Sequence, residues 1–97
     1  MIQLKDFMPI NFLKKESFTG SHKGMRFRME KVQTEGEGVP RLGVTVWPEP
    51  YGYDATPDSE KERILLDFDA EGLAQGVEWI NRQHEAQSSR WKAASGR

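Results

Sequence analysis

Few residues of this chain have the types and spacing that nucleophilic or metal chemistry requires. There are two histidines, His22 and His84, and no cysteine. A metal site needs three or four ligands, and the sequence has no H-x-x-x-H or H-E-x-x-H spacing. Ser21 adjoins His22, but a catalytic pair also needs a third group that orients the base. We therefore expect no catalytic residue, no metal and no cofactor, and His84 is interpreted as a packed or helix-capping residue.

One glycine-containing segment has the spacing of a phosphate-binding motif. Residues 33–38 (QTEGEG) fit the Q/R-x-x-G-x-G/A pattern by which GNAT acetyltransferases hold the coenzyme A pyrophosphate. That cradle uses backbone N–H groups at a helix N-terminus. Here Val39-Pro40 and a predicted strand follow the glycines, and two glutamates oppose an anion. We expect residues 33–40 to form a hairpin loop, with acyl-CoA binding as an alternative.

Arginine and tryptophan side chains share one face of two predicted strands. These residues are Arg26 and Arg28 on the first strand and Arg41 and Trp47 on the second. Arginine beside aromatic rings suits stacking on nucleic-acid bases and contact with phosphates. The alternative is an ordinary solvated face with cross-strand ion pairs to Asp67 and Asp69. The nearly neutral charge of the chain favours this second interpretation.

A rigid aromatic turn follows the second predicted strand. Residues 47–53 (WPEPYGY) place Trp47, Tyr51 and Tyr53 beside two prolines, whose φ angles are preset. Tyrosine and tryptophan dominate protein-binding hot spots because they supply a large contact area at low entropic cost. The alternative is that the three rings cap the end of the core. The sequence does not decide between the two.

The elements that must position these residues follow from hydrophobic periodicity. Apolar and polar residues alternate over 25–29 and 41–47, which predicts an antiparallel strand pair, and residues 64–69 fit a third strand. Residues 19–24 are typical of a turn, and residues 56–63 of a short helical turn with Thr56 as N-cap. Asp69 is the expected N-cap of a helix from Ala70 to about Gln87, whose buried Gly76 would allow a close approach to the sheet.

The predicted fold class is α+β. We expect a three-stranded antiparallel sheet with one long C-terminal helix packed on it, and an apolar N-terminal arm that protects the other face or an edge. The expected organisation is an arm over residues 1–18, a single domain over 19–87 and a flexible tail over 88–97.

Composition bounds the class of protein. The 97 residues have a formal charge of −1 and a pI near 6.1, which argues against a general coat for nucleic acid or anionic membranes. A mean hydropathy of −0.75 and the lack of a long apolar run exclude a transmembrane helix. The N-terminus lacks the pattern of a signal peptide, so a cytoplasmic location is expected.

Several segments of the chain resemble a group of small bacterial proteins of uncharacterised activity. The shared pattern is FTGSxxGMRFR, then WPEPY, ATP and EWIN in the same order, and it covers roughly residues 14–85. Some members of that group carry an automatic GNAT-acetyltransferase label. The resemblance implies one compact fold, and it implies no activity.

The combined expectation is a small non-enzymatic protein-interaction module whose partner is a protein. Its candidate binding residues are Trp47, Tyr51, Tyr53, Arg26, Arg28 and Arg41. Three alternatives stay open: a nucleic-acid-associated factor that uses the Arg/Trp face, a minimal acyl-CoA-binding or acetyltransferase-like protein, and an inhibitor of a host system encoded by a mobile element. Exposed sheet edges would also permit a homodimer.

Overall fold

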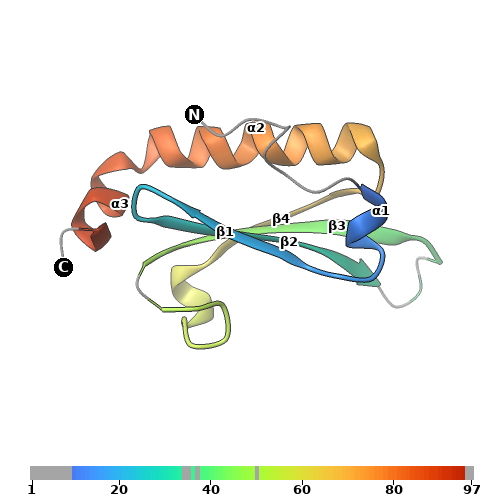
Figure 1. Ribbon diagram of the computed structural model, residues 1–97, viewed down its shortest axis with the longest axis horizontal. Helices are drawn as coiled ribbons and strands as arrows, with labels where there is room; N and C mark the ends of the chain where they lie inside the picture. Colours follow the sequence, from blue (N-terminus) through green and yellow to red (C-terminus); the bar gives the residue numbers. More distant parts are fainter. Residues whose placement is uncertain (1–9, 34–35, 37, 50, 96–97) are drawn as a thin grey trace.

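A computed structural model describes residues 10–33, 36, 38–49 and 51–95. Its elements, in chain order, are α1 (Ile10–Leu13), β1 (Phe18–His22), β2 (Met25–Gln33), β3 (Pro40–Pro48), the 3₁₀ turn η2 (Asp58–Glu60), β4 (Glu62–Asp67), α2 (Ala70–Ala86) and α3 (Ser88–Ser95). The four strands form one antiparallel sheet in the order β1-β2-β3-β4. Helix α2 lies along one face of this sheet, and the β3–β4 connection lies on the other side (Figure 1). The α+β class is confirmed.

The sheet has four strands, so the prediction of three was wrong. Strand β1 occupies part of the segment predicted as a turn, and only Lys23 and Gly24 form the tight turn to β2. Both have positive φ, 47° and 90°, as a two-residue hairpin turn of type I′ requires. Gly20 leaves room for the ring of Phe27, because a Cβ on Gly20 would stand 2.7 Å from Phe27 Cζ. The glycine that suggested a turn is therefore a packing position within a strand.

The other strands agree with the periodicity, with shifted ends. Strand β2 extends to Gln33, which pairs with Pro40 of β3, so the hairpin loop is shorter than the predicted 33–40. Strand β4 begins at Glu62 and ends at Asp67, two residues earlier at each end than predicted. The predicted helical turn over 56–63 is reduced to η2, which is preceded by Pro57 with no side-chain cap. Thr56 instead donates its hydroxyl to the carbonyl oxygen of Gly52 at 2.8 Å.

The main helix begins as its sequence indicates. The Asp69 side chain accepts a hydrogen bond from the Gly72 backbone N–H at 2.7 Å, which confirms the predicted N-cap. Gly76 faces the sheet, and a Cβ there would stand 3.0 Å from Met29 Cε and 3.1 Å from Val44 Cγ2. The expected close approach of helix and sheet is therefore confirmed. The buried core between them contains Leu13, Met25, Phe27, Met29, Leu42, Val44, Val46, Leu73, Val77, Ile80 and Trp91.

The predicted flexible tail is a helix as far as it is described. Helix α3 follows α2 after a single residue, Gln87, and places Trp91 in the core with 1% of its surface exposed. The indole Nε1 of Trp91 donates to the backbone carbonyl of Gln83 at 3.1 Å. The sequence of this segment shows no helical periodicity, because one large side chain carries most of its packing.

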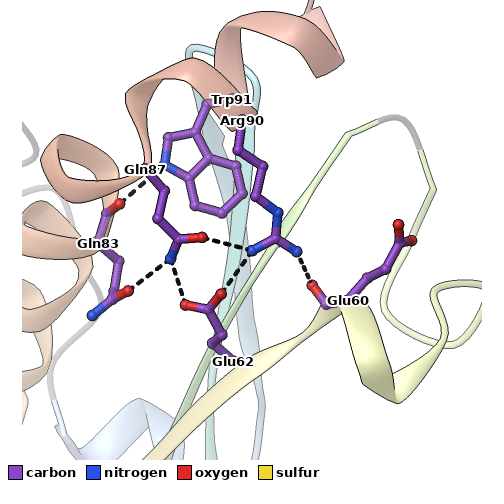
Figure 2. A network of polar contacts seen from close by, with 6 residues as sticks. All are labelled: Glu60, Glu62, Gln83, Gln87, Arg90 and Trp91. Carbon is purple, nitrogen blue, oxygen red and sulfur yellow. Dashed lines mark hydrogen bonds and ion pairs between the residues drawn. The ribbon is translucent and has the colours of Figure 1, made fainter.

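A polar network joins α3 to the start of β4 (Figure 2). The Glu62 carboxylate accepts from Gln87 Nε2 with one oxygen and from Arg90 Nη1, at 2.7 Å, with the other. Arg90 also donates to the Glu60 backbone carbonyl. These contacts hold the end of the chain against the edge strand, and they satisfy the charges of Glu62 and Arg90 internally. The network is structural, and we assign it no binding role.

The expected N-terminal arm lies only partly within the described residues, which begin at Ile10. Helix α1 places Leu13 in the same core as α2, and Phe18 opens strand β1. The face of the sheet away from α2 is covered in part by the β3–β4 connection, which is described over residues 49 and 51–61 (Figure 1). No helix in the described part of the chain is long and apolar enough to cross a membrane.

Candidate functional site

The face of the sheet that is turned away from α2, here called the open face, collects the charged strand residues. Strand register and alternation place these side chains on it: Arg26, Arg28 and Glu30 from β2, Arg41, Thr45 and Trp47 from β3, and Arg63, Leu65 and Asp67 from β4. Arg28, Thr45 and Arg63 form one row across three strands, and Arg26 pairs with Trp47 in the next row. The open face is therefore rich in arginine.

The aromatic turn covers one end of the open face. Trp47 is completely buried, and its indole Nε1 donates to the Tyr51 carbonyl oxygen at 2.9 Å. The half-buried Tyr53 ring meets Trp47 edge-on, with 5.5 Å between ring centroids. Lys61 fixes Tyr53 by donating to its carbonyl at 3.0 Å, with Nζ 4.1 Å from the ring centroid. Trp47 was expected to contact a partner, but it is a capping residue that no partner reaches in this conformation.

Tyr51 is the one aromatic of the predicted binding turn that stays accessible among the described residues. Its side chain is 61% exposed, whereas Trp47 is buried and Tyr53 is half-buried. The capping interpretation therefore holds for Trp47 and Tyr53, and contact with a partner stays a prediction for Tyr51. Two of its rings cap the core, and the third remains available as a contact.

Two of the four arginines on the open face, Arg28 and Arg41, have a carboxylate at ion-pair distance among the described residues. Arg41 Nη1 lies 2.9 Å from Asp67 Oδ1, which confirms the expected cross-strand pair. The other expected acceptor, Asp69, caps α2 instead. Arg28 Nε lies 3.2 Å from Glu30 Oε2, and its guanidinium carbon lies 4.4 Å from the Tyr53 ring centroid. Two of the three arginines proposed for binding therefore have a carboxylate of their own.

Arg26 and Arg63 differ from the other arginines of this face. Within the described residues, neither has a carboxylate at ion-pair distance. The buried Nε of Arg26 makes no hydrogen bond, and the same holds for Arg28 Nε, which nevertheless lies at ion-pair distance from Glu30. The Arg63 guanidinium lies against Gly43, where a Cβ would stand 3.0 Å from Nη2. The two groups flank β3, and they are the charges of this face that an external anion can neutralise.

A pocket opens on the same face beside the aromatic turn. It has a volume of about 230 Å³ and is lined by Thr45, Tyr53, Asp58, Lys61 and Arg63. Thr45 is only 2% exposed, and its Oγ1 has no hydrogen-bond partner among the described residues. Sequence reasoning did not assign Thr45, Lys61 or Arg63 to a site. The signal was available for Arg63, since a strand that begins at Glu62 puts it on the open face.

The two histidines meet on the other side of the sheet. His22 ends β1 and His84 lies in the last turn of α2, with ring centroids 4.8 Å apart. Burial, and after it the charges of His84 and Lys23, lower the pKa of His22. Burial and the charge of Lys23 also lower the pKa of His84. Both imidazoles are therefore held toward their neutral form, and no group of three metal-ligating side chains exists among the described residues.

The glycine motif does not have the surroundings of a coenzyme A cradle. Gly36 and Gly38 have φ of 89° and 70° and are exposed in the loop between β2 and β3. A strand follows this loop, so the helix N-terminus that such a cradle uses is not there. Residues 34, 35 and 37 of the motif lie outside the described residues.

No protein-family model, no curated protein and no solved structure matches the chain. The resemblance to small bacterial proteins stays a prediction.

Proposed function

We propose that the protein is a non-enzymatic interaction module that binds an acidic segment of a protein partner on the open face of its sheet. The observation that carries the proposal is the pair of guanidinium groups at Arg26 and Arg63. Each lies beside β3 without a carboxylate among the described residues, while Arg28, Arg41 and Lys61 each have one. Arg26 is half-buried, where a charged group without a partner is costly and an external carboxylate lowers that cost. Arg63 is exposed, so its guanidinium is open to a partner.

Apolar exposure beside these arginines favours a protein as the partner. Leu65 is 47% exposed and follows Arg63 by two residues on the same face of the edge strand. Tyr51 is exposed at the aromatic turn. A peptide that combines carboxylates with apolar side chains complements this mixture, whereas a nucleic-acid backbone gains nothing from Leu65.

The proposal changes the predicted interface. Arg26 and Tyr51 remain contact residues, and Arg63 and Leu65 join them. Trp47 and Tyr53 become the support of the face, because Trp47 is buried and the Tyr53 ring of the β3–β4 connection packs edge-on against it.

Fluorescence anisotropy tests the proposal with two labelled probes, a peptide of alternating glutamate and leucine and a thymidine oligonucleotide. The peptide is expected to bind more tightly, and the double variant Arg26→Gln/Arg63→Gln is expected to weaken it at least tenfold. Arg82→Gln removes an exposed arginine on α2 and serves as the matched control. Tighter binding of the oligonucleotide, with a steep salt dependence, would show that the open face binds nucleic acid instead. Equal peptide binding by all three proteins would remove the proposal.

A further inference from the structure

We infer that the pocket formed by Thr45, Tyr53, Lys61 and Arg63 is a binding site for a small oxyanion, either a carboxylate or a phosphate group. This inference goes beyond the proposed function, because the ligand itself is a small anion and needs no protein partner. It shares Arg63 with the proposed interface and does not involve Arg26, Leu65 or Tyr51. The two proposals can therefore fail separately.

The Thr45 hydroxyl provides the first argument. Thr45 lies on the open face between the core residues Val44 and Val46, and it is 2% exposed. Its Oγ1 is buried and has no hydrogen-bond partner among the described residues. Buried hydroxyls are nearly always hydrogen-bonded in folded proteins. The atom is closed to solvent in this conformation, so donation to a ligand in the pocket requires a rotation of the Thr45 side chain or of its cross-strand neighbour Arg63.

The two cations of the pocket provide the second argument. Lys61 Nζ is largely enclosed, with 12% of its side chain exposed, and it lies 3.2 Å from Asp58 Oδ1. It also donates to the Tyr53 carbonyl, which leaves one of its three protons for a ligand. The guanidinium of Arg63 has no carboxylate among the described residues. One carboxylate therefore faces two cations, and the pocket keeps a net positive charge.

The geometry places the carboxylate at the rim. The Asp58 side chain is fully exposed, whereas Thr45, which lines the same pocket, is buried. An anion that reaches Thr45 lies deeper than Asp58 and receives donors from β3, from β4 and from Lys61. The pocket has a volume of about 230 Å³, far more than one water needs, so it has room for an oxyanion and part of the group that carries it.

Thermal unfolding of the full chain tests this inference, with inorganic phosphate and acetate as separate ligands and sodium chloride at matched ionic strength as the reference. A specific site gives a saturable stabilisation beyond chloride. At ten times the dissociation constant, the folding equilibrium constant is expected to rise about elevenfold. A response to phosphate alone identifies a phosphoryl ligand, and a response that includes acetate identifies a carboxylate ligand.

Two variants assign the response to the pocket. Thr45→Val keeps the shape of the side chain and removes the hydroxyl, so it is expected to raise the melting temperature without anion and to abolish the response to it. Arg63→Gln is expected to abolish the stabilisation by the anion without raising the melting temperature. Arg82→Gln is expected to keep the stabilisation by the anion. Backbone amide shifts at residues 45, 53 and 61 on titration provide an independent reading of the same site.

The inference is overturned if neither anion stabilises the protein beyond chloride, or if Thr45→Val and Arg63→Gln both respond as the wild type does. Peptide binding that persists in Thr45→Val alongside a failed anion response leaves the proposed function intact. Loss of peptide binding with a retained anion response removes only the proposed function.

Discussion

The Arg63 guanidinium lies against the backbone of Gly43 on the neighbouring strand. A Cβ built on Gly43 would stand 3.0 Å from Arg63 Nη2 and 3.5 Å from Nε. Glycine at this position therefore lets the longest side chain of β4 lie across β3 toward the centre of the open face. Gly43 has no side chain that could bind a partner, but it determines where the Arg63 guanidinium lies, and the proposed interface depends on that group.

Gly43→Ala is expected to displace Arg63 and to weaken binding of the acidic peptide severalfold. The new methyl group would also meet Val32 Cγ2 at 2.8 Å, so we expect a loss of stability of about 1–2 kcal/mol. Anisotropy measures the first effect and urea unfolding the second. Wild-type peptide affinity in a variant that is destabilised as expected would show that the position of Arg63 is unimportant.

Gly20→Ala is expected to destabilise the protein by about 1–3 kcal/mol, because its methyl group would overlap the Phe27 ring at 2.7 Å. Gly52→Ala is the matched control, since nothing lies within 4 Å of a Cβ at that position. Urea unfolding of both variants gives the comparison. Similar small losses in the two would contradict the packing of β1 on the core.

Trp91→Ala is expected to cost about 3–5 kcal/mol, a typical value for the removal of a buried tryptophan. This loss of stability has two sources, the cavity left in the core and the removal of the hydrogen bond from Nε1 to the Gln83 carbonyl. Ser89→Ala changes an exposed residue of the same helix and is expected to be nearly neutral. A neutral effect of Trp91→Ala would restore the view of residues 88–95 as a peripheral tail.

Stability is expected to fall as the pH drops below the ordinary histidine pKa of 6.5. The pKa values of His22 and His84 are lowered in the folded protein, mainly by burial. The unfolded chain therefore binds more protons than the folded one in this range, and protonation favours unfolding. The stabilisation is fully present above pH 6.5 and is lost as the pH falls toward the lowered values.

An NMR titration of the imidazole protons, together with urea unfolding at acidic and neutral pH, measures this effect. His84→Gln is expected to raise the pKa of His22, because it removes a nearby positive charge. A pKa of His22 at or above 6.5 in the wild type would contradict the close approach of the two rings.

The parts of the fold that were predicted correctly depend on local chemistry. Asp69 and the helix that follows it were recognisable because an N-cap and a 3.6-residue period lie within one short stretch of sequence. The alternation of β2 and β3 is equally local. The Gly76 approach also followed from the helix, since a glycine on a buried face needs a neighbour close to the backbone.

The parts that were predicted wrongly depend on contacts between distant segments. Strand β1 carries Gly20 and small polar residues, and it is held by pairing with β2 and by the Phe27 ring. Helix α3 depends on Trp91 reaching the core. For Trp47 a binding role and a capping role both stayed open, because nothing in its own segment shows that the following residues fold back over it.

Only part of the candidate site could be predicted, because the rest of it also depends on contacts between distant segments. The sequence placed Arg26, Arg28 and Arg41 on one face, and the Arg41–Asp67 pair was expected. Which arginines lack a carboxylate depends on the register of β4, and its start at Glu62 was missed. The pocket around Thr45 depends on the fold of the β3–β4 connection, which no sequence period describes.

The most direct test of the central claim is a backbone NMR titration of the full chain with the acidic peptide. The amide signals of residues 26, 43, 63 and 65 are expected to shift together and to saturate, and the double variant Arg26→Gln/Arg63→Gln is expected to abolish the shifts. Shifts confined to the outer side of α2, around Glu78 and Arg82, or no shift at saturating peptide, would contradict the assignment of the open face as the binding surface.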